Sequence, residues 1–173
     1  MKTIFITALA GSLLMAAPAA LAEPSQEFVN KAAIGGMFEV ESGKLARTRS
    51  ESPDLRALAM MLEQDHRKAN VRLAEVAKGE KLTVPSSLDS AHAAKLKDLE
   101  ATKSGVDSKF LAVQKTAHAD SIETFEAYAK DGGNKQLKAL AEDMLPTLQQ
   151  HHDQIEKLID GDDATPEPVK PVN

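Results

Sequence analysis

The 173-residue sequence contains no cysteine, no tryptophan and a single tyrosine. Without cysteine the protein has no disulfide bonds, no thiolate metal ligands, no covalently attached c-type haem and no lipid anchor of the lipoprotein kind. Its stability must therefore come from side-chain packing. The scarcity of aromatic residues, together with abundant Ala, Leu, Lys and Glu, favours helices over a β-sandwich.

The chain also lacks an excess of positive charge. It has 21 Lys and Arg against 26 Asp and Glu, a formal net charge of −5. An acidic protein is repelled by phosphate backbones and anionic headgroups, which disfavours nucleic acid and anionic lipid as partners. Glycine-rich phosphate loops, nucleophile elbows and zinc-protease motifs are missing as well, so nothing in the sequence indicates a hydrolase.

The first 22 residues have the pattern of a secretory signal peptide. Lys2 precedes an apolar run, and the sequence Ala-Leu-Ala at 20–22 provides a small-x-small cleavage site. The apolar run is shorter than the ~20 residues that cross a bilayer. We expect cleavage before Glu23, a periplasmic or secreted mature protein, and no membrane span in the mature chain.

Apolar periodicity and capping signals predict four long helices. They cover approximately residues 26–50, 53–78, 107–131 and 135–160, and a short helix is expected at 89–102 within the connection. Ser25, Ser52 and Asn134 are the expected N-caps, and Pro146 should kink the last helix. Residues 23–160 then form one domain, and the Pro-rich tail 161–173 is expected to be disordered.

The arrangement of these segments predicts an all-α fold. The second and fourth long helices carry heptad-like apolar seams, which are typical of helices that pack at small crossing angles. Two hairpins with short turns, joined by one long crossover that contains a short helix, describe a ferritin-like four-helix bundle. In that arrangement the second and third long helices run parallel.

Four polar residues occupy positions that should face the bundle interior. His66 and His151 interrupt the apolar seams, and His118 and Glu39 share faces with apolar or small residues. Three imidazoles and a carboxylate can hold one divalent metal ion such as Zn, Fe or Cu. Two alternatives stay open: a buried His–Glu network that fixes the helix register, and residues that simply face solvent.

The remaining candidates are weaker. Glu41 is the alternative inward carboxylate if Glu39 faces out, and His152 is a second-choice ligand that should lie outside the cluster. His92, Glu63 and Asp65 are expected on the surface. A dinuclear iron site needs Glu-x-x-His in two helices, but the second half has Leu-Gln-Gln-His at 148–151, so a ferritin-type di-iron oxidase does not fit.

These residues carry a resemblance to a known family. The segments FEVESGKLA at 38–46, DH at 65–66 and LPTLQQH at 145–151, with the Pro85 segment and His118, resemble family 4142 of domains of unknown function. Its members are often labelled exported or outer-membrane proteins. The resemblance implies a ferritin-like bundle with characteristic positions at Glu39, His66, His118 and His151. Val106 stands where the family usually has an aromatic residue. No established reaction is implied.

Three function hypotheses follow from the sequence. The first is an exported ferritin-like protein that binds one divalent metal ion in the bundle core. The second is a non-catalytic structural or interaction protein with a buried His–Glu network, and the third is a small metal-dependent oxidoreductase. No residue is assigned a catalytic role, and the sequence is compatible with an oligomer.

Overall fold

The computed structural model describes residues 24–162, which form five α-helices and no β-strand. The helices are α1 (Ser25–Arg49), α2 (Pro53–Gly79), α3 (Ser90–Ala101), α4 (Val106–Asp131) and α5 (Lys135–Asp162). The predicted all-α class is confirmed, and each helix end lies within two residues of its prediction. None of these helices combines the length and apolar content that crossing a bilayer requires. Residues 161 and 162 were expected in the disordered tail, but they are the last two residues of α5. The expected signal peptide and residues 163–173 of the tail lie outside the described residues.

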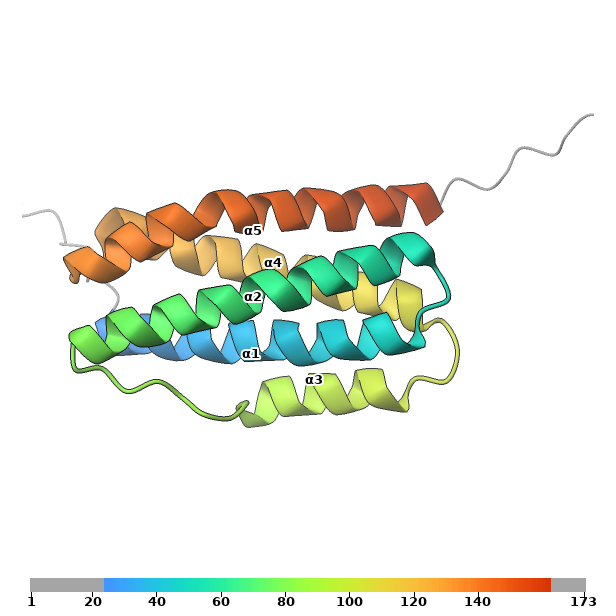
Figure 1. The fold of residues 1–173 in the computed structure, drawn as a ribbon, viewed down its shortest axis with the longest axis horizontal. Helices are drawn as coiled ribbons and strands as arrows, with labels where there is room; N and C mark the ends of the chain where they lie inside the picture. Colours follow the sequence, from blue (N-terminus) through green and yellow to red (C-terminus); the bar gives the residue numbers. More distant parts are fainter. Residues whose placement is uncertain (1–23, 163–173) are drawn as a thin grey trace, which may run out of the picture.

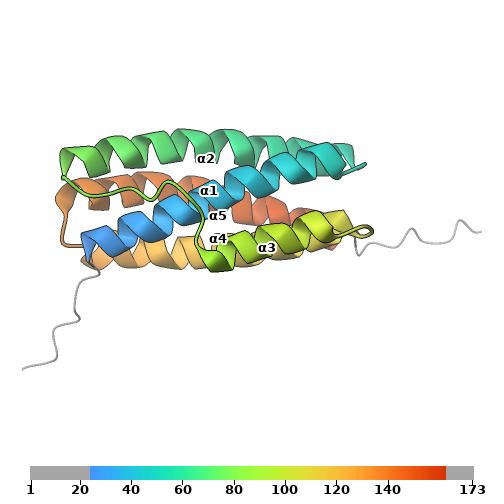
Figure 2. The same ribbon diagram turned by 90° about the horizontal axis from the view of Figure 1, so that it is seen from below.

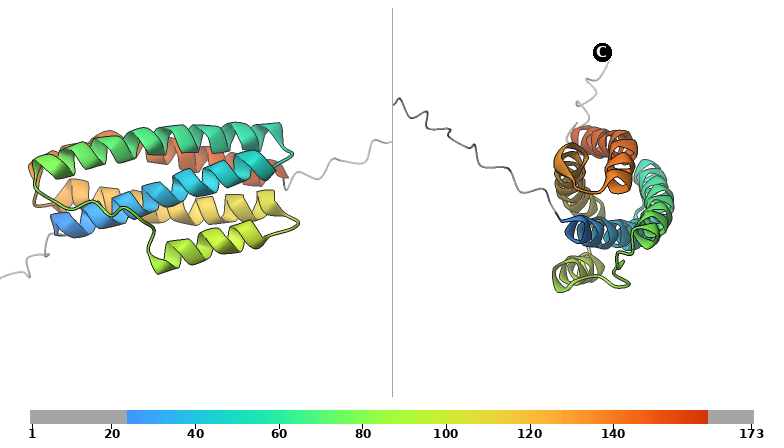
Figure 3. Two further views of the ribbon diagram at one scale, coloured as in Figure 1. Left: turned by 60° about the horizontal axis from the view of Figure 1, so that its bottom comes forward. Right: turned by 90° about the vertical axis from the view of Figure 1, so that its left-hand side faces the viewer.

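The long helices form two antiparallel hairpins. α1 packs along α2, and α4 packs along α5 (Figure 1). The connection over residues 80–105 runs back along the bundle and contains α3, so α2 and α4 run parallel, as predicted (Figures 1 and 2). The end-on view shows α3 outside the four long helices (Figure 3). One long crossover of this kind is the ferritin-like arrangement.

The hairpin turns end in side-chain caps. The Ser52 hydroxyl accepts a hydrogen bond from the Leu55 N–H at 3.3 Å, and the Asn134 side-chain oxygen accepts one from the Leu137 N–H at 3.0 Å. Each bond satisfies an N–H group that the first turn of a helix leaves unpaired. Both predicted caps are therefore confirmed, and they fix where α2 and α5 begin.

The predicted cap at Ser25 is wrong. Ser25 is the first residue of α1, and no side chain caps this helix. The Ser25 hydroxyl instead lies 2.7 Å from the hydroxyl of Tyr128, near the end of α4. The Tyr128 ring also stacks on Phe28, with ring centroids 4.1 Å apart. The hydroxyl thus links the start of α1 to the end of α4 and is not available as a cap.

The buried interior consists of two apolar clusters with a polar layer between them. The first cluster contains Phe28, Val29, Ala32, Ala33, Leu73, Ala77, Phe125, Tyr128, Leu137, Leu140, Ala141 and Leu148. The second contains Ala46, Leu55, Leu58, Ala59, Leu62, Leu99, Phe110, Leu111 and Ile155. On each long helix, buried polar residues fall between these sets: Glu39, Ser42, His66, Gln114, His118 and His151. Buried polar groups cost free energy unless they are paired. The polar side chains of this layer must therefore form hydrogen bonds within the protein.

Gly43 and Pro146 are two positions where the residue type affects the helices directly. A Cβ atom on Gly43 would lie 3.0 Å from the backbone oxygen of Ala59, so a larger residue at this position of α1 would crowd the backbone of α2. Pro146 lies inside α5, which stays one helix from Lys135 to Asp162. The kink predicted at Pro146 remains a prediction.

Candidate metal centre

The four residues predicted as metal ligands come from four different helices and are all buried. Glu39 lies on α1, His66 on α2, His118 on α4 and His151 on α5, with relative exposures of 1%, 6%, 0% and 2%. The alternative that they face solvent is therefore wrong. All four belong to the polar layer between the two apolar clusters.

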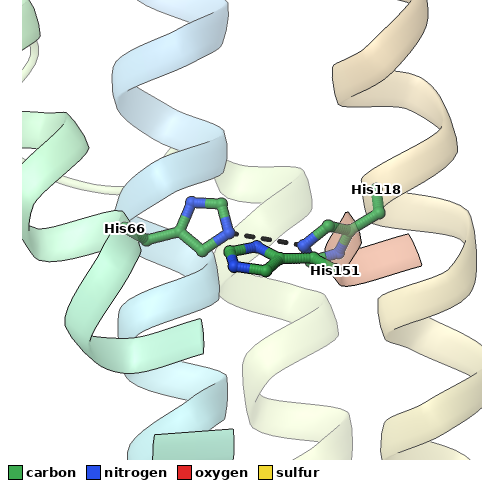
Figure 4. A group of neighbouring side chains, drawn as sticks. All are labelled: His66, His118 and His151. Carbon is green, nitrogen blue, oxygen red and sulfur yellow. Dashed lines mark hydrogen bonds between the residues drawn. The ribbon is translucent and has the colours of Figure 1, made fainter. Parts of the chain in front are cut away.

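The three histidines meet at one point in the bundle. Their ring centroids lie 5.4, 5.4 and 5.5 Å apart, so the rings form a nearly equilateral triangle. Each ring offers one nitrogen to a group in which all such atoms lie within 4.8 Å of one another. Figure 4 shows His66, His118 and His151 pointing toward one another from their separate helices. The sequence spacing can place three side chains at the same height along the bundle axis. Only the packing of the helices brings these side chains together across that axis.

A backbone hydrogen bond fixes the tautomer of His118. Its Nδ1 atom lies 3.1 Å from the carbonyl oxygen of Gln114, one turn earlier in α4. A carbonyl only accepts, so Nδ1 carries the hydrogen and Nε2 keeps its lone pair. That Nε2 atom lies 3.4 Å from the Nε2 atom of His66. In the metal-free protein His66 is then the donor of this hydrogen bond.

A carboxylate performs the same function for His151. The Nε2 atom of His151 lies 3.4 Å from Oδ2 of Asp65, so Nε2 carries the hydrogen. The Nδ1 atom of His151 is buried and has no hydrogen-bond partner among residues 24–162. It therefore keeps a free lone pair. Hydrogen bonds from the second ring nitrogen to a carboxylate or carbonyl are the usual way in which proteins orient metal-binding histidines.

The electrostatics of the site keep all three imidazoles neutral. Burial, and after it the neighbouring His151, lower the pKa of His118 to about 3, although the hydrogen bond to the Gln114 carbonyl opposes the change. Burial also lowers the pKa of His66 well below its ordinary value, and the two neighbouring histidines lower this pKa to a smaller extent. The pKa of His151 is lowered by burial, although Asp65 opposes the change. Neutral imidazole is the form that binds metal.

The structure does not bring Glu39 into the same group as the histidines. Its Oε1 atom lies 3.9 Å from Nδ1 of His118, which is the nitrogen already bonded to Gln114. Burial raises the pKa of Glu39 to about 8, although the side chain of Gln114 opposes the shift. The Oε2 atom of Glu39 and the Oε1 atom of Gln114 are buried acceptors without a hydrogen-bond partner in the described chain.

The choice between Glu39 and Glu41 is clear. Glu41 is exposed and pairs with Lys44 at 2.6 Å, so Glu39 is the inward carboxylate. Glu63 lies on the outer flank of α2, where it pairs with Arg47 at 3.2 Å and with Arg67 at 2.9 Å.

Two surface predictions need correction. Asp65 was expected to be an ordinary surface charge, but α5 packs beside α2 and brings His151 to its carboxylate. Its position directly before His66 is the only sequence signal for this contact. His92 was expected to be exposed, but it lies in α3 and is partly covered by Phe38, with ring centroids 5.5 Å apart.

His152 lies outside the histidine cluster. Its side chain is 21% exposed, and Nδ1 lies 3.8 Å from Oε2 of Glu156. With Asp153 these residues form a second group of candidate ligand atoms on the surface of α5. Glu156 also pairs with Lys115 at 2.9 Å, so the negative charge of this group is partly offset.

Solved structures share this fold at low sequence identity. A DUF305 fragment from Deinococcus radiodurans matches with a TM-score of 0.70 and 14% identity, over 81% of this chain and 98% of the fragment. CopM in its Cu(II)-bound form matches with a TM-score of 0.69 and 16% identity, over 82% of this chain and 99% of CopM. These similarities support the helical-bundle fold. No curated protein matches the chain.

The family assignment rests on the sequence as a whole. The sequence pattern of the family described as domain of unknown function (DUF4142) matches residues 10–158. This range includes the four long helices up to the last turn of α5 and all residues of the polar layer. The chain therefore belongs to the DUF4142 family.

Proposed function

We propose that this protein binds one divalent metal ion through His66, His118 and His151, with copper as the preferred metal, and that it acts outside the cytoplasm. The observation that carries the proposal is the convergence of three neutral imidazoles, two of which have their second nitrogen held by a hydrogen bond. Hydrogen bonds to Gln114 and Asp65 select the tautomers that leave a lone pair for the metal.

The spacing of the ring nitrogens supports a bound metal ion, without selecting copper. Metal–nitrogen bonds of ~2.0–2.1 Å at tetrahedral angles separate two ligand nitrogens by roughly 3.3–3.4 Å. The Nε2 atoms of His66 and His118 lie 3.4 Å apart. The candidate ligand nitrogen of His151 lies within 4.8 Å of those of the other two histidines.

Copper is preferred for two reasons. Imidazole sites bind Cu²⁺ more tightly than the other divalent metals of the first transition row. In addition, the structurally similar CopM has been solved with Cu(II) bound. Zn²⁺ and Fe²⁺ are the next candidates, because both accept imidazole ligands.

A structural role for the polar layer is the alternative. It is favoured by the buried hydrogen bond from Gln114 Nε2 to the Ser42 hydroxyl, 2.9 Å long, which joins α4 to α1 without any metal. The His66–His118 hydrogen bond similarly joins α2 to α4. Such a layer fixes the register of four helices even if no ion ever binds.

A copper titration separates the two functions. Residues 23–173 are titrated with Cu(II), then with Zn(II), by calorimetry, and bound metal is measured by elemental analysis after gel filtration. We expect one equivalent of Cu(II), absent from a variant with His66→Ala, His118→Ala and His151→Ala. A double variant with His92→Ala and His152→Ala is the matched control and should bind normally. Equal copper binding by the triple variant would contradict the proposal.

The stability of the protein gives a second readout. A ligand that binds only the folded state stabilises it by ~2.7 kcal/mol when present at a hundredfold excess over its dissociation constant. We expect copper to raise the unfolding free energy of the wild-type protein by this amount, and to leave that of His66→Ala unchanged. If the layer is purely structural, His66→Ala lowers the stability, but copper changes neither protein.

Export is tested on material from the native host. The proposal expects a protein whose intact mass corresponds to a chain that begins at Glu23, recovered from the periplasm or the medium. A chain that retains residues 1–22 and stays with the membrane would contradict the extracytoplasmic part of the proposal and leave the metal site unaffected.

A further inference from the structure

A cavity of about 310 Å³ lies beside the bundle, between α1, the first half of α3 and α4. Figures 2 and 3 show α3 running along the outside of α1 and α4. The volume is at the lower end of the range of small-molecule pockets. His66, His118 and His151 do not line the cavity, so it is separate from the candidate metal centre.

The walls of the cavity are aromatic and aliphatic. Phe38 on α1 and Phe125 on α4 contribute rings that are 1% and 7% exposed, and Ile34 adds an aliphatic surface. Such walls favour the apolar part of an organic molecule. The faces of aromatic rings also attract organic cations, more strongly where water is excluded.

The charged groups of the cavity are mainly acidic. Four carboxylates, those of Glu27, Glu39, Asp89 and Asp120, line it together with two lysines, Lys31 and Lys95. Lys31 pairs with Glu27 at 3.1 Å, so these two charges offset each other. Asp89 is hydrogen-bonded to His92 at 2.8 Å. Lys95 acts electrostatically on Glu39. Four carboxylates against two lysines still leave the lining with an excess of acidic groups, which favours a positively charged ligand.

Glu39 is the buried carboxyl of the cavity lining. Its carboxyl is 1% exposed, it contacts His118 in the core, and its Oε2 atom has no hydrogen-bond partner among residues 24–162. A buried acceptor without a partner costs free energy, which a donor on a ligand can recover. This orphaned oxygen is the reason to expect a ligand at this place rather than mere imperfect packing.

We propose that the cavity between α1, α3 and α4 binds a small organic ammonium ion, with its charged nitrogen at Glu39 and its apolar body between Phe38 and Phe125. The site does not use the three histidines, although Glu39 lies beside His118. It assigns Glu39 a role as ligand-binding carboxylate in place of the metal-binding role that the sequence suggested.

Two probe cations test the proposal. Metal-free protein is titrated with phenethylamine and with benzyltrimethylammonium by calorimetry above pH 8, where Glu39 is ionised. The uncharged 2-phenylethanol and the anion phenylacetate are the comparison ligands. We expect saturable 1:1 binding of at least one cation, about tenfold tighter than the alcohol, the scale of a single charge interaction in a partly dry site.

Two variants locate the binding. Glu39→Gln keeps the shape of the side chain and should weaken cation binding by about tenfold. Gly35 and Ser121 both line the cavity, and a Cβ atom on Gly35 would lie 3.9 Å from the Ser121 hydroxyl. Gly35→Leu should therefore fill the cavity and abolish binding, whereas Gly35→Ala should leave it intact and controls for helix effects.

Several outcomes would overturn the proposal. They are the absence of saturable binding by both cations, equal binding of the alcohol, preferred binding of phenylacetate, and unchanged cation binding by Gly35→Leu. Gly35→Leu should still bind one equivalent of copper, which shows that the variant is folded. Failure of the cation site and failure of the metal site are thus observed separately.

Discussion

The Nε2 atoms of His66 and His118 lie 3.4 Å apart in the bundle interior, although 52 positions separate the two residues in the chain. The hydrogen bond between them requires that the accepting ring, His118, is neutral, since an imidazolium has no acceptor nitrogen. The pKa values of both histidines are lowered mainly by burial. This pair thus couples the fold to pH.

The first prediction concerns acid stability of the metal-free protein. A histidine with a lowered folded-state pKa binds fewer protons than it does when unfolded, so stability falls as pH drops below 6.5 toward the folded-state value of about 3 for His118. Above pH 6.5 this effect is absent. Chemical denaturation at several pH values gives the slope of the unfolding free energy against pH. Between pH 6 and 5 this slope should be shallower for His118→Gln than for the wild-type protein, by about 1.4 kcal/mol per pH unit. His152→Gln, outside the buried layer, should keep the original slope.

The second prediction has the opposite sign and concerns Glu39. Its folded-state pKa is raised from 4.5 to about 8, mainly by burial. The neutral carboxyl is favoured by folding, so its contribution is complete below pH 4.5 and is lost as pH rises toward 8. Glu39→Gln cannot ionise, and its stability relative to the unvaried protein should rise through this interval, by up to about 1.4 kcal/mol per pH unit.

The matched control is Glu41→Gln, two residues away on the exposed face of α1. Its stability difference from the unvaried protein should not depend on pH in this interval. If Glu39→Gln behaves in the same way, the carboxyl of Glu39 is ionised and compensated in the folded protein, contrary to the structure.

The third prediction tests the carboxylate beside the metal centre. Asp65→Asn removes the charge that holds the Nε2–H of His151 but keeps the size of the side chain. Loss of such a supporting group typically lowers metal affinity by about 10- to 100-fold. A copper competition titration should show this decrease at unchanged stoichiometry. Glu63→Gln, on the same helix but paired with arginines, should leave the affinity unchanged.

The fourth prediction concerns the turn between α4 and α5. A Cβ atom on Gly132 would lie 2.5 Å from the backbone oxygen of Tyr128, whereas one on Gly133 would meet no atom within 4 Å. Gly132→Ala should destabilise the protein by about 1–3 kcal/mol because the backbone of α4 must shift. Gly133→Ala should change the unfolding free energy much less, and equal effects of the two substitutions in thermal denaturation would contradict the close contact.

The helices were predictable because their signals are local. The Ser52 and Asn134 caps, the short hairpin turns and the apolar seams lie within a few residues of the features they determine. His66 and His151 interrupt those seams, so their burial followed from the periodicity. The inward position of Glu39 was left open against Glu41, since neither residue belongs to a clear seam.

The contacts across helices were not predictable in the same way. Asp65 lies about 100° around α2 from His66, and only the position of α5 brings it to His151. The number of residues from each turn likewise placed Glu39 at the height of the histidines along the bundle axis. It did not give the distance between the side chains across the bundle. In the bundle the carboxyl of Glu39 lies at the Nδ1 edge of His118, while the Nε2 edge of that ring faces His66.

The distribution of the three histidines over the two hairpins has a further consequence. The first hairpin contributes one imidazole and the second contributes two, so neither half alone offers a complete set of ligands. A bound ion would close loops of the chain between α2 and the second hairpin, as a cross-link does. In a sequence without cysteine, the ion would act as a reversible cross-link between the two hairpins. The stability that it adds would depend on the concentration of available metal.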